Sequence, residues 1–218
     1  MKCRDIVLMV ALISLVGCNS GPATNGNIAI PKAPALTGTE TSAEGTDTFR
    51  VEFQTTAGDF VVEVHPDWAP RGAERFRELV QADFLADCRF FRVIKNFMVQ
   101  FGIHGDPTVS TVWKEKTIMD DPVKKSNKRG YVTFATSGPD SRTSQIFINY
   151  KDNRQLDDNG FSPIGQVISG MDVVDSLNDN YGGTPSDFQP QIQDQGNAFL
   201  DAKFPGLDFI KTAKIIEP

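Results

Sequence analysis

The sequence predicts a mainly β fold, a closed eight-stranded antiparallel β-barrel capped by two α-helices. Three observations support this prediction. Eight short runs have the composition of strands, only two stretches have helical spacing, and about 170 residues are available for one domain with one core. Closure would also remove the exposed strand edges that otherwise lead to aggregation. The periodicity alone is nearly as compatible with a β-sandwich.

The first two strands form a predicted hairpin. Phe49, Val51 and Phe53 alternate with polar residues, and the same period of two returns over residues 60–64. The Gly-containing turn at residues 57–59 separates the two runs. Two alternating runs joined by a short glycine turn are typical of a β-hairpin.

A helix of three or four turns is predicted after the hairpin. Pro70 stands near its start, where the fixed φ angle and the missing N–H group of proline are tolerated. Ala73, Phe76, Leu79 and Val80 fall on one helical face, which indicates an amphipathic helix packed on the core. The charged residues expected on its other faces are Arg71, Glu74, Arg75 and Glu78.

Six further strands and a second helix complete the predicted domain. The helix covers Met171 to Leu177, with apolar residues at helical spacing. Residues 179–208, rich in Gly, Gln, Asn and Pro, carry no clear pattern, and loops of that length are either functional or disordered. The predicted strands are Phe90–Ile94, Phe97–Ile103, Tyr131–Thr136, Ile146–Asn149, Ile164–Ile168 and Phe209–Ile216.

The first 17 residues have the pattern of a signal peptide. Lys2 and Arg4 form a basic start, and the apolar run Ile6–Val16 has about half of the ~20 residues that a membrane-spanning helix needs. The run ends in Leu15-Val16-Gly17-Cys18, which resembles the lipobox of bacterial lipoproteins. We therefore expect a lipoprotein signal peptide over 1–17 and a lipid on Cys18. An ordinary secretory signal with an incidental Cys18 is the alternative.

The segment after Cys18 predicts a tether rather than a domain. Residues 18–48 are mostly small and polar, so they cannot bury enough surface to offset the entropy of ordering, and a lipid-anchored flexible linker is expected. The folded domain then covers 49–218. We expect it to lie in the bacterial cell envelope, outside the cytoplasm and in the periplasm. Asn19, directly after the expected lipidated cysteine, favours the outer membrane.

Charge, cysteines and histidines exclude several classes of protein. The formal net charge is −6 and no block of Lys and Arg is present, which argues against nucleic acid as a partner. Cys3 would leave with the signal and Cys18 would be lipidated, so Cys88 stands alone and no disulfide is expected. His65 and His104 are far apart, without ligand spacing. We therefore predict neither a metal nor a cofactor.

Three segments carry a family resemblance. Residues 90–100 read FFRVIKNFMVQ, residues 133–148 read TFATSGPDSRTSQIFI, and residues 156–167 read LDDNGFSPIGQV. In this order they resemble the signature segments of the cyclophilin-type peptidyl-prolyl cis/trans isomerases, over about residues 49–216. The resemblance implies a cyclophilin-like barrel and an enzyme (EC 5.2.1.8) that accelerates rotation of X-Pro bonds in secreted or envelope proteins.

The chemistry of proline isomerisation fits these residue types. Rotation of the X-Pro bond crosses a barrier of roughly 18–20 kcal/mol without making or breaking a covalent bond, so no nucleophile or metal is needed. The twisted amide gains from a hydrogen-bond donor that binds it more tightly than the planar amide. Arg92 matches the catalytic arginine of the family, and its fixed fork of charged donors suits that role. A surface salt-bridge arginine is the alternative.

The resemblance also implies a set of substrate-binding residues. Four apolar positions match the proline pocket, two glutamines match polar positions that orient the arginine or the peptide, and two residues match a strand edge that pairs with the peptide. Two phenylalanines match the pocket rim: the first replaces the histidine that many members carry beside the arginine, and the second is the best match to the family's pocket histidine. The pocket residues could instead be barrel core, and the second glutamine a buried amide. In that order they are Phe97, Met98, Phe147 and Leu156; Gln100 and Gln145; Ala135 and Thr136; Phe91 and Phe161.

Other functions fit less well. A non-catalytic module or chaperone that binds proline-containing peptides could use the same fold, but the intact set around Arg92 argues against it. A serine hydrolase is not expected because no Gly-x-Ser-x-Gly elbow is present. Gln155 stands where eukaryotic members often carry the tryptophan that grips cyclosporin, so we expect weak cyclosporin binding. The expected partners are proline-containing polypeptides, and the expected state is a monomer.

Overall fold

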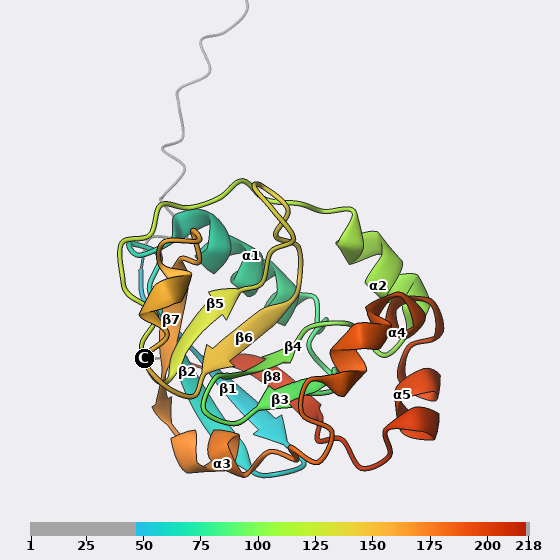
Figure 1. Ribbon diagram of the computed structural model, residues 1–218. Helices are drawn as coiled ribbons and strands as arrows, with labels where there is room; N and C mark the ends of the chain where they lie inside the picture. Colours follow the sequence, from blue (N-terminus) through green and yellow to red (C-terminus); the bar gives the residue numbers. More distant parts are fainter. Residues whose placement is uncertain (1–46, 217–218) are drawn as a thin grey trace, which may run out of the picture. The chain divides into compact units, whose positions relative to one another are not determined.

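Eight strands form one antiparallel sheet in the computed structural model, which describes residues 47–216 (Figure 1). The order of the strands across the sheet is β3-β4-β6-β5-β7-β2-β1-β8. All eight predicted strands are present, with shifts of a few residues at some ends. Their bounds are β1 Phe49–Thr55, β2 Asp59–Val64, β3 Arg92–Ile94, β4 Met98–Phe101, β5 Tyr131–Phe134, β6 Ile146–Asn149, β7 Pro163–Ser169 and β8 Ile210–Ile216.

The expected closure of the barrel is wrong. The sheet is an open half-barrel, because β3 and β8 form its two edges and do not pair along their length in the described part of the chain. Just before the two strands, residues 87–90 and 208–210 are joined by main-chain hydrogen bonds and by one bridge, Arg89 with Phe209. The edge of β3 is occupied instead by residues 179–208, since the Val93 N–H donates to the Gly182 carbonyl at 3.0 Å. A covered edge is protected from aggregation without closure.

The β1–β2 hairpin follows the predicted alternation. Phe49, Val51 and Phe53 are buried, and the rings of Phe53 and Phe60 stack on the core side with centroids 4.7 Å apart. In the turn, Gly58 has a φ of +132° and its carbonyl accepts the Thr55 N–H at 3.0 Å. Such a φ lies in the region that favours glycine, which explains the residue at this position.

Both predicted helices are present, and three further α-helices were not predicted. Helix α1 spans Pro70–Gln81 and buries the predicted apolar face. Helix α3 spans Met171–Ser176, within the predicted range, and contacts β2. The prediction of only two helices is wrong because the 104–129 connection holds α2 and residues 179–208 are ordered. The remaining helical elements are α2 Pro107–Lys114, α4 Gln189–Gln195, α5 Asn197–Lys203 and the 3₁₀ turns η1 Arg154–Leu156 and η2 Thr184–Phe188.

Two hydrophobic clusters lie in the described residues. The larger one joins the sheet to α1 and α3. The smaller one packs α4 and α5 on residues at the edge of the sheet, and Figure 1 shows α2, α4 and α5 gathered beside β3 and β4. We call residues 179–208 the insertion. The buried members of its cluster are Phe91, Ile103, Ile192, Leu200, Phe204 and Leu207.

The expected signal peptide over 1–17, the lipid on Cys18 and nearly all of the 18–48 linker lie outside the described residues. Within residues 47–216, the helices are too short or too polar to cross a membrane.

Candidate active site

A cavity of about 200 Å³ opens beside β3 and β4 and brings the predicted site residues together. Nine of its ten lining residues belong to the predicted set, and the tenth, Gln189, comes from the insertion. The pocket is therefore built by segments that are far apart in the sequence. Its lining residues are Arg92, Phe97, Met98, Gln100, Ala135, Thr136, Phe147, Leu156, Phe161 and Gln189.

Arg92 begins β3 and presents its guanidinium to the cavity. Nη1 donates to Gln100 Oε1 at 3.2 Å, across the antiparallel pair that β3 forms with β4. Nε is buried and has no hydrogen-bond partner among the described residues. Burial lowers the pKa of the Arg92 guanidinium, while the negative charge of Asp187 raises it, and the net direction is downward. An arginine stays charged after such a change, so Arg92 presents a cation at the pocket, and only its Nη1 is hydrogen-bonded among the described residues.

Two glutamines continue from Arg92 along the edge of the site. The Gln100 Nε2 donates to the Gln145 Oε1 at 2.8 Å, so the two amides and the guanidinium form one chain of hydrogen bonds. Gln100 is buried on β4, and Gln145 directly precedes β6. Gln145 lines a second cavity of about 510 Å³ rather than the first.

The apolar side of the pocket is formed by aromatic and aliphatic groups. The rings of Phe147 and Phe161 pack edge to face with centroids 5.7 Å apart. Phe97 lies in the turn between β3 and β4, not in the strand, so it can face the same cavity as Met98 despite the alternation within β4. The Phe97 ring centroid is 6.0 Å from the Arg92 guanidinium carbon. A small apolar ring in this cavity would therefore contact apolar side chains on several sides and the Arg92 guanidinium on another.

The end of β5 borders both cavities. Ala135 N–H donates to the Gln145 carbonyl at 2.9 Å, while the main-chain groups of Thr136 make no hydrogen bond within residues 47–216. The Thr136 hydroxyl is engaged in its own loop, bonded to the Gly138 carbonyl and to Ser141. Free main-chain groups at a strand end can pair with an extended peptide.

Phe91 does not lie where it was expected. Its side chain is 1% exposed and packs in the cluster of the insertion, so the expected position at the pocket rim is wrong. The reason is the direction of β3, which sends the Arg92 side chain to the cavity and its neighbour to the other face. The phenylalanine that stands in place of the family's usual histidine is thus covered by the insertion.

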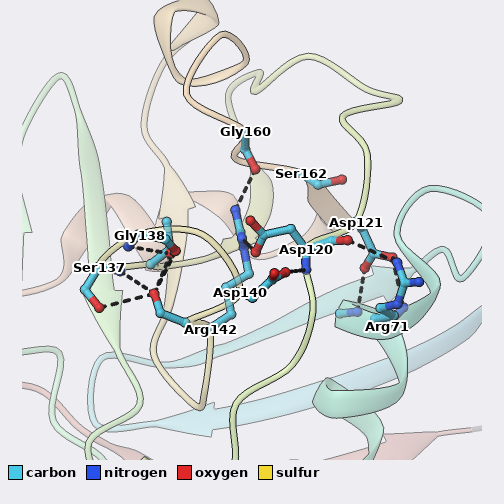
Figure 2. A network of polar contacts seen from close by, with 12 residues as sticks. Arg71, Asp120, Asp121, Ser137, Gly138, Asp140, Arg142, Gly160 and Ser162 are labelled. Atoms are coloured by element: carbon cyan, nitrogen blue, oxygen red, sulfur yellow. Dashed lines mark hydrogen bonds and ion pairs between the residues drawn. The ribbon is translucent and has the colours of Figure 1, made fainter.

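The loops next to the pocket are held by a buried arginine that the sequence did not single out. Arg142, 4% exposed, forms an ion pair with Asp120, and its Nη2 donates to the Gly160 carbonyl at 2.5 Å (Figure 2). Gly160 precedes Phe161, whose ring centroid is 6.0 Å from the Arg142 guanidinium carbon. One side chain therefore ties three segments together beside the pocket.

A second buried arginine supports the same region. Arg75, expected on an exposed face of α1, is only 7% exposed. It donates to the main-chain carbonyls of Lys116 and, at 3.0 Å, Thr143. It also pairs with Glu78 and faces the ring of Trp113. The helical pattern gave no signal for this, because its partners lie 41 and 68 residues further along the chain.

Fold and site together define an antiparallel β-sheet protein with a pocket of a size for a small apolar ring, next to a charged donor and a strand end with free main-chain groups. Comparison with known proteins agrees with that class. The model of the family described as "Cyclophilin type peptidyl-prolyl cis-trans isomerase/CLD" matches residues 50–195, and the chain belongs to this family. It is a peptidyl-prolyl cis/trans isomerase, and isomerases of this family bind proline-containing peptides.

Individual relatives extend this result. A peptidyl-prolyl cis-trans isomerase of Acinetobacter baylyi is 38% identical over 156 residues, which are 66% of this chain and 80% of the relative. Peptidyl-prolyl cis-trans isomerase 10 of Caenorhabditis elegans is 38% identical over 134 residues, 58% of this chain and 80% of the relative. A crystal structure of a Cryptosporidium parvum cyclophilin-type isomerase shares the fold at 21% identity, with a TM-score of 0.60, covering 79% of this chain and 99% of that one.

Proposed function

We propose that Arg92 accelerates rotation of the X-Pro bond by donating to the twisted amide while the apolar pocket holds the proline ring. The observation that carries this proposal is the Arg92 guanidinium, which lines the pocket and makes a single hydrogen bond, to Gln100, among the described residues. A donor fixed in a partly dry site stabilises the transition state without needing to reorganise. The remaining pocket residues contribute by holding the ring and excluding water.

The Gln100 contact supports this role. By accepting from Arg92 Nη1, it holds the guanidinium against β4. The peptide would run along the free main chain of Thr136, beside Ala135, with residues before the proline over the larger cavity. The pocket then binds the ring, and the strand edge binds the backbone.

The test is exchange NMR on an X-Pro peptide, which needs no coupled protease. Arg92→Ala is expected to reduce the catalysed exchange rate about 100-fold, the size of effect found when one oxyanion-type donor is removed. Lys211→Ala, at an exposed position of β8, is the control and is expected to keep the parental rate. If Arg92→Ala is folded and keeps the parental rate, the proposed role of Arg92 is wrong.

We further propose that the isomerase acts on secreted or envelope proteins, as a monomer tethered by a lipid on Cys18. The support is the sequence Leu15-Val16-Gly17-Cys18 after a short apolar run. Metabolic labelling with a fatty acid in a bacterial host, followed by membrane fractionation, tests the anchor. The parent should be labelled and sediment with membranes, whereas Cys18→Ala should be unlabelled. Equal labelling of both would refute the anchor.

A further inference from the structure

The chain of hydrogen bonds that starts at Arg92 does not end at Gln145. Gln145 Nε2 donates to Gln189 Oε1 at 3.0 Å, so the chain runs from the arginine through Gln100 to the insertion. Arg92 has only donors and requires an oxygen from Gln100. That choice turns the Gln100 amide nitrogen towards Gln145, which in turn needs an acceptor from Gln189. The cation at one end thus sets the direction of every amide.

Gln189 is held firmly at the far end of this chain. It is the first residue of α4, and Ile192 of the same helix is 1% exposed in the cluster with Phe91 and Phe204. On the next turn, Gln193 Oε1 accepts from the Ser110 hydroxyl of α2 at 2.8 Å. The helix is therefore fixed to the sheet edge by packing and to α2 by a hydrogen bond.

Gln189 also has a place in the cavities themselves. It lines both the cavity of about 200 Å³ and the one of about 510 Å³, together with Gln100, Ala135 and Thr136. Asp187, two residues earlier in the insertion, places a negative charge close enough to act on Arg92. The insertion therefore reaches the active site by a hydrogen bond and by charge.

We propose that Gln189 is a positioning residue of the isomerase, which holds Arg92 in its working orientation through Gln145 and Gln100. This proposal rests on the proposed role of Arg92. Gln189 supplies the acceptor for Gln145 Nε2, and no neighbouring strand among the described residues supplies another. Without it, the Gln145 amide is free to rotate, Gln100 loses its fixed acceptor, and Arg92 samples orientations that do not face the twisted amide.

The test compares three variants of the full chain by exchange NMR on an X-Pro peptide. Gln189→Met keeps the length of the side chain but removes the acceptor, and Gln189→Glu keeps an acceptor. Gln191→Met, at an exposed position of the same helix, is the control. Loss of one hydrogen bond of about 1 kcal/mol predicts a fall in kcat of about fivefold for Gln189→Met, with KM changed less than twofold. Gln189→Glu and Gln191→Met should stay within about twofold of the parent.

A second readout does not depend on activity. The Arg92 Nε–H and the Gln100 and Gln145 side-chain amide resonances should shift in Gln189→Met and stay near their parental positions in Gln191→Met. A folded Gln189→Met with unchanged kcat and unchanged resonances overturns the proposal. So does a loss that appears only in KM, since Gln189 would then be a wall of the cavity. If Arg92→Ala keeps the parental activity while the resonances still shift in Gln189→Met, the proposed role of Arg92 is wrong but the series of hydrogen bonds from Arg92 to Gln189 is supported.

Discussion

Two regions border the active-site cavity, and they are held in place by different physics. The loop wall, residues 136–145 and 154–161, is fixed by directional bonds from buried arginines, as Figure 2 shows for Arg142. The insertion wall, residues 184–195, is fixed by burial of aromatic and aliphatic side chains around Phe204. Within residues 47–216, a single hydrogen bond joins the two walls, from the Gln145 side-chain amide to that of Gln189.

The difference shows what each wall can tolerate. A buried ion pair adds little net stability, because desolvation of the charges offsets their attraction, but removal of one partner leaves the other uncompensated. A hydrophobic cluster has no preferred bond direction and loses stability in proportion to the volume removed. The loop wall should therefore respond sharply to single polar changes and to pH, and the insertion wall to changes of size.

The largest expected effect is loss of a ring from the insertion wall. Phe204→Ala removes a side chain that packs against Tyr181 and Phe188, at centroid distances of 5.3 and 5.9 Å. It should destabilise the insertion by about 3 kcal/mol, as for other buried phenylalanines. Amide hydrogen exchange should rise over residues 181–204 and stay slow in β1 and β2. Gln195→Ala, at an exposed position, is the control, and equal acceleration in β1 and β2 would contradict separate stabilisation of the insertion.

An intermediate effect is expected from the loop wall. Arg142→Met leaves Asp120 and the Gly160 carbonyl without their partner, which should lower the free energy of unfolding by about 2 kcal/mol, since Asp120 keeps some contact with water. The KM for an X-Pro peptide should rise because Phe161 loses its support. Urea denaturation and exchange NMR measure the two quantities. Lys151→Met is the exposed control, and an unchanged KM would refute the support of Phe161 by Arg142.

The smallest expected effect is a pH dependence of the unfolding free energy that comes from the loop wall and not from the insertion wall. Burial alone would raise the pKa of Asp157, but hydrogen bonds from Ser126 and Asn127 outweigh it and leave that pKa below its usual value. A lowered pKa in the folded state gives stability that is present above the unfolded value, about 3.9, and lost as the pH falls through the folded one. The difference in unfolding free energy between the parent and Asp157→Asn should therefore shrink below about pH 4.

Urea denaturation of both proteins from pH 6 to pH 2.5 measures this change. Phe204→Ala serves as the comparison, because its loss of stability comes from packing and should stay nearly constant over the same range. A parallel pH dependence for the two variants would remove the distinction between the walls.

The sequence predicted most of the sheet and most of the pocket. Alternation located β1 and β2, strand-like composition located the other six strands, and the three signature segments named nine residues that line the cavity together. The open form of the sheet was not predictable, because the edge of β3 is covered by Gly182, which lies 89 residues away from Val93 in the sequence. The insertion shows no helical periodicity of apolar residues in the sequence. Its helices α4 and α5 have only seven residues each, and they pack around aromatic groups of several segments.

The buried polar contacts could also not be predicted from the sequence. Arg142 lies in an irregular loop, where no periodicity distinguishes a buried arginine from an exposed one, and its acceptors are 22 and 18 residues away. The burial of Phe91 could have been suspected from its neighbour Arg92, because alternate residues of a strand face opposite sides. Gln189 carried no signal, since a glutamine between a phenylalanine and a proline fits an ordinary loop.

The pairing of β1 with β8 has a consequence for the order of folding. These strands are the first and the last of the domain, and Arg50 lies opposite Ile216. During synthesis, one side of β1 therefore has no strand beside it until β8 is available. Contacts of such long separation slow folding, and the sheet is completed only after β8 has been made. An enzyme that catalyses a slow step in the folding of other proteins therefore has, in its own domain, a strand pairing that can form only after β8 has been made.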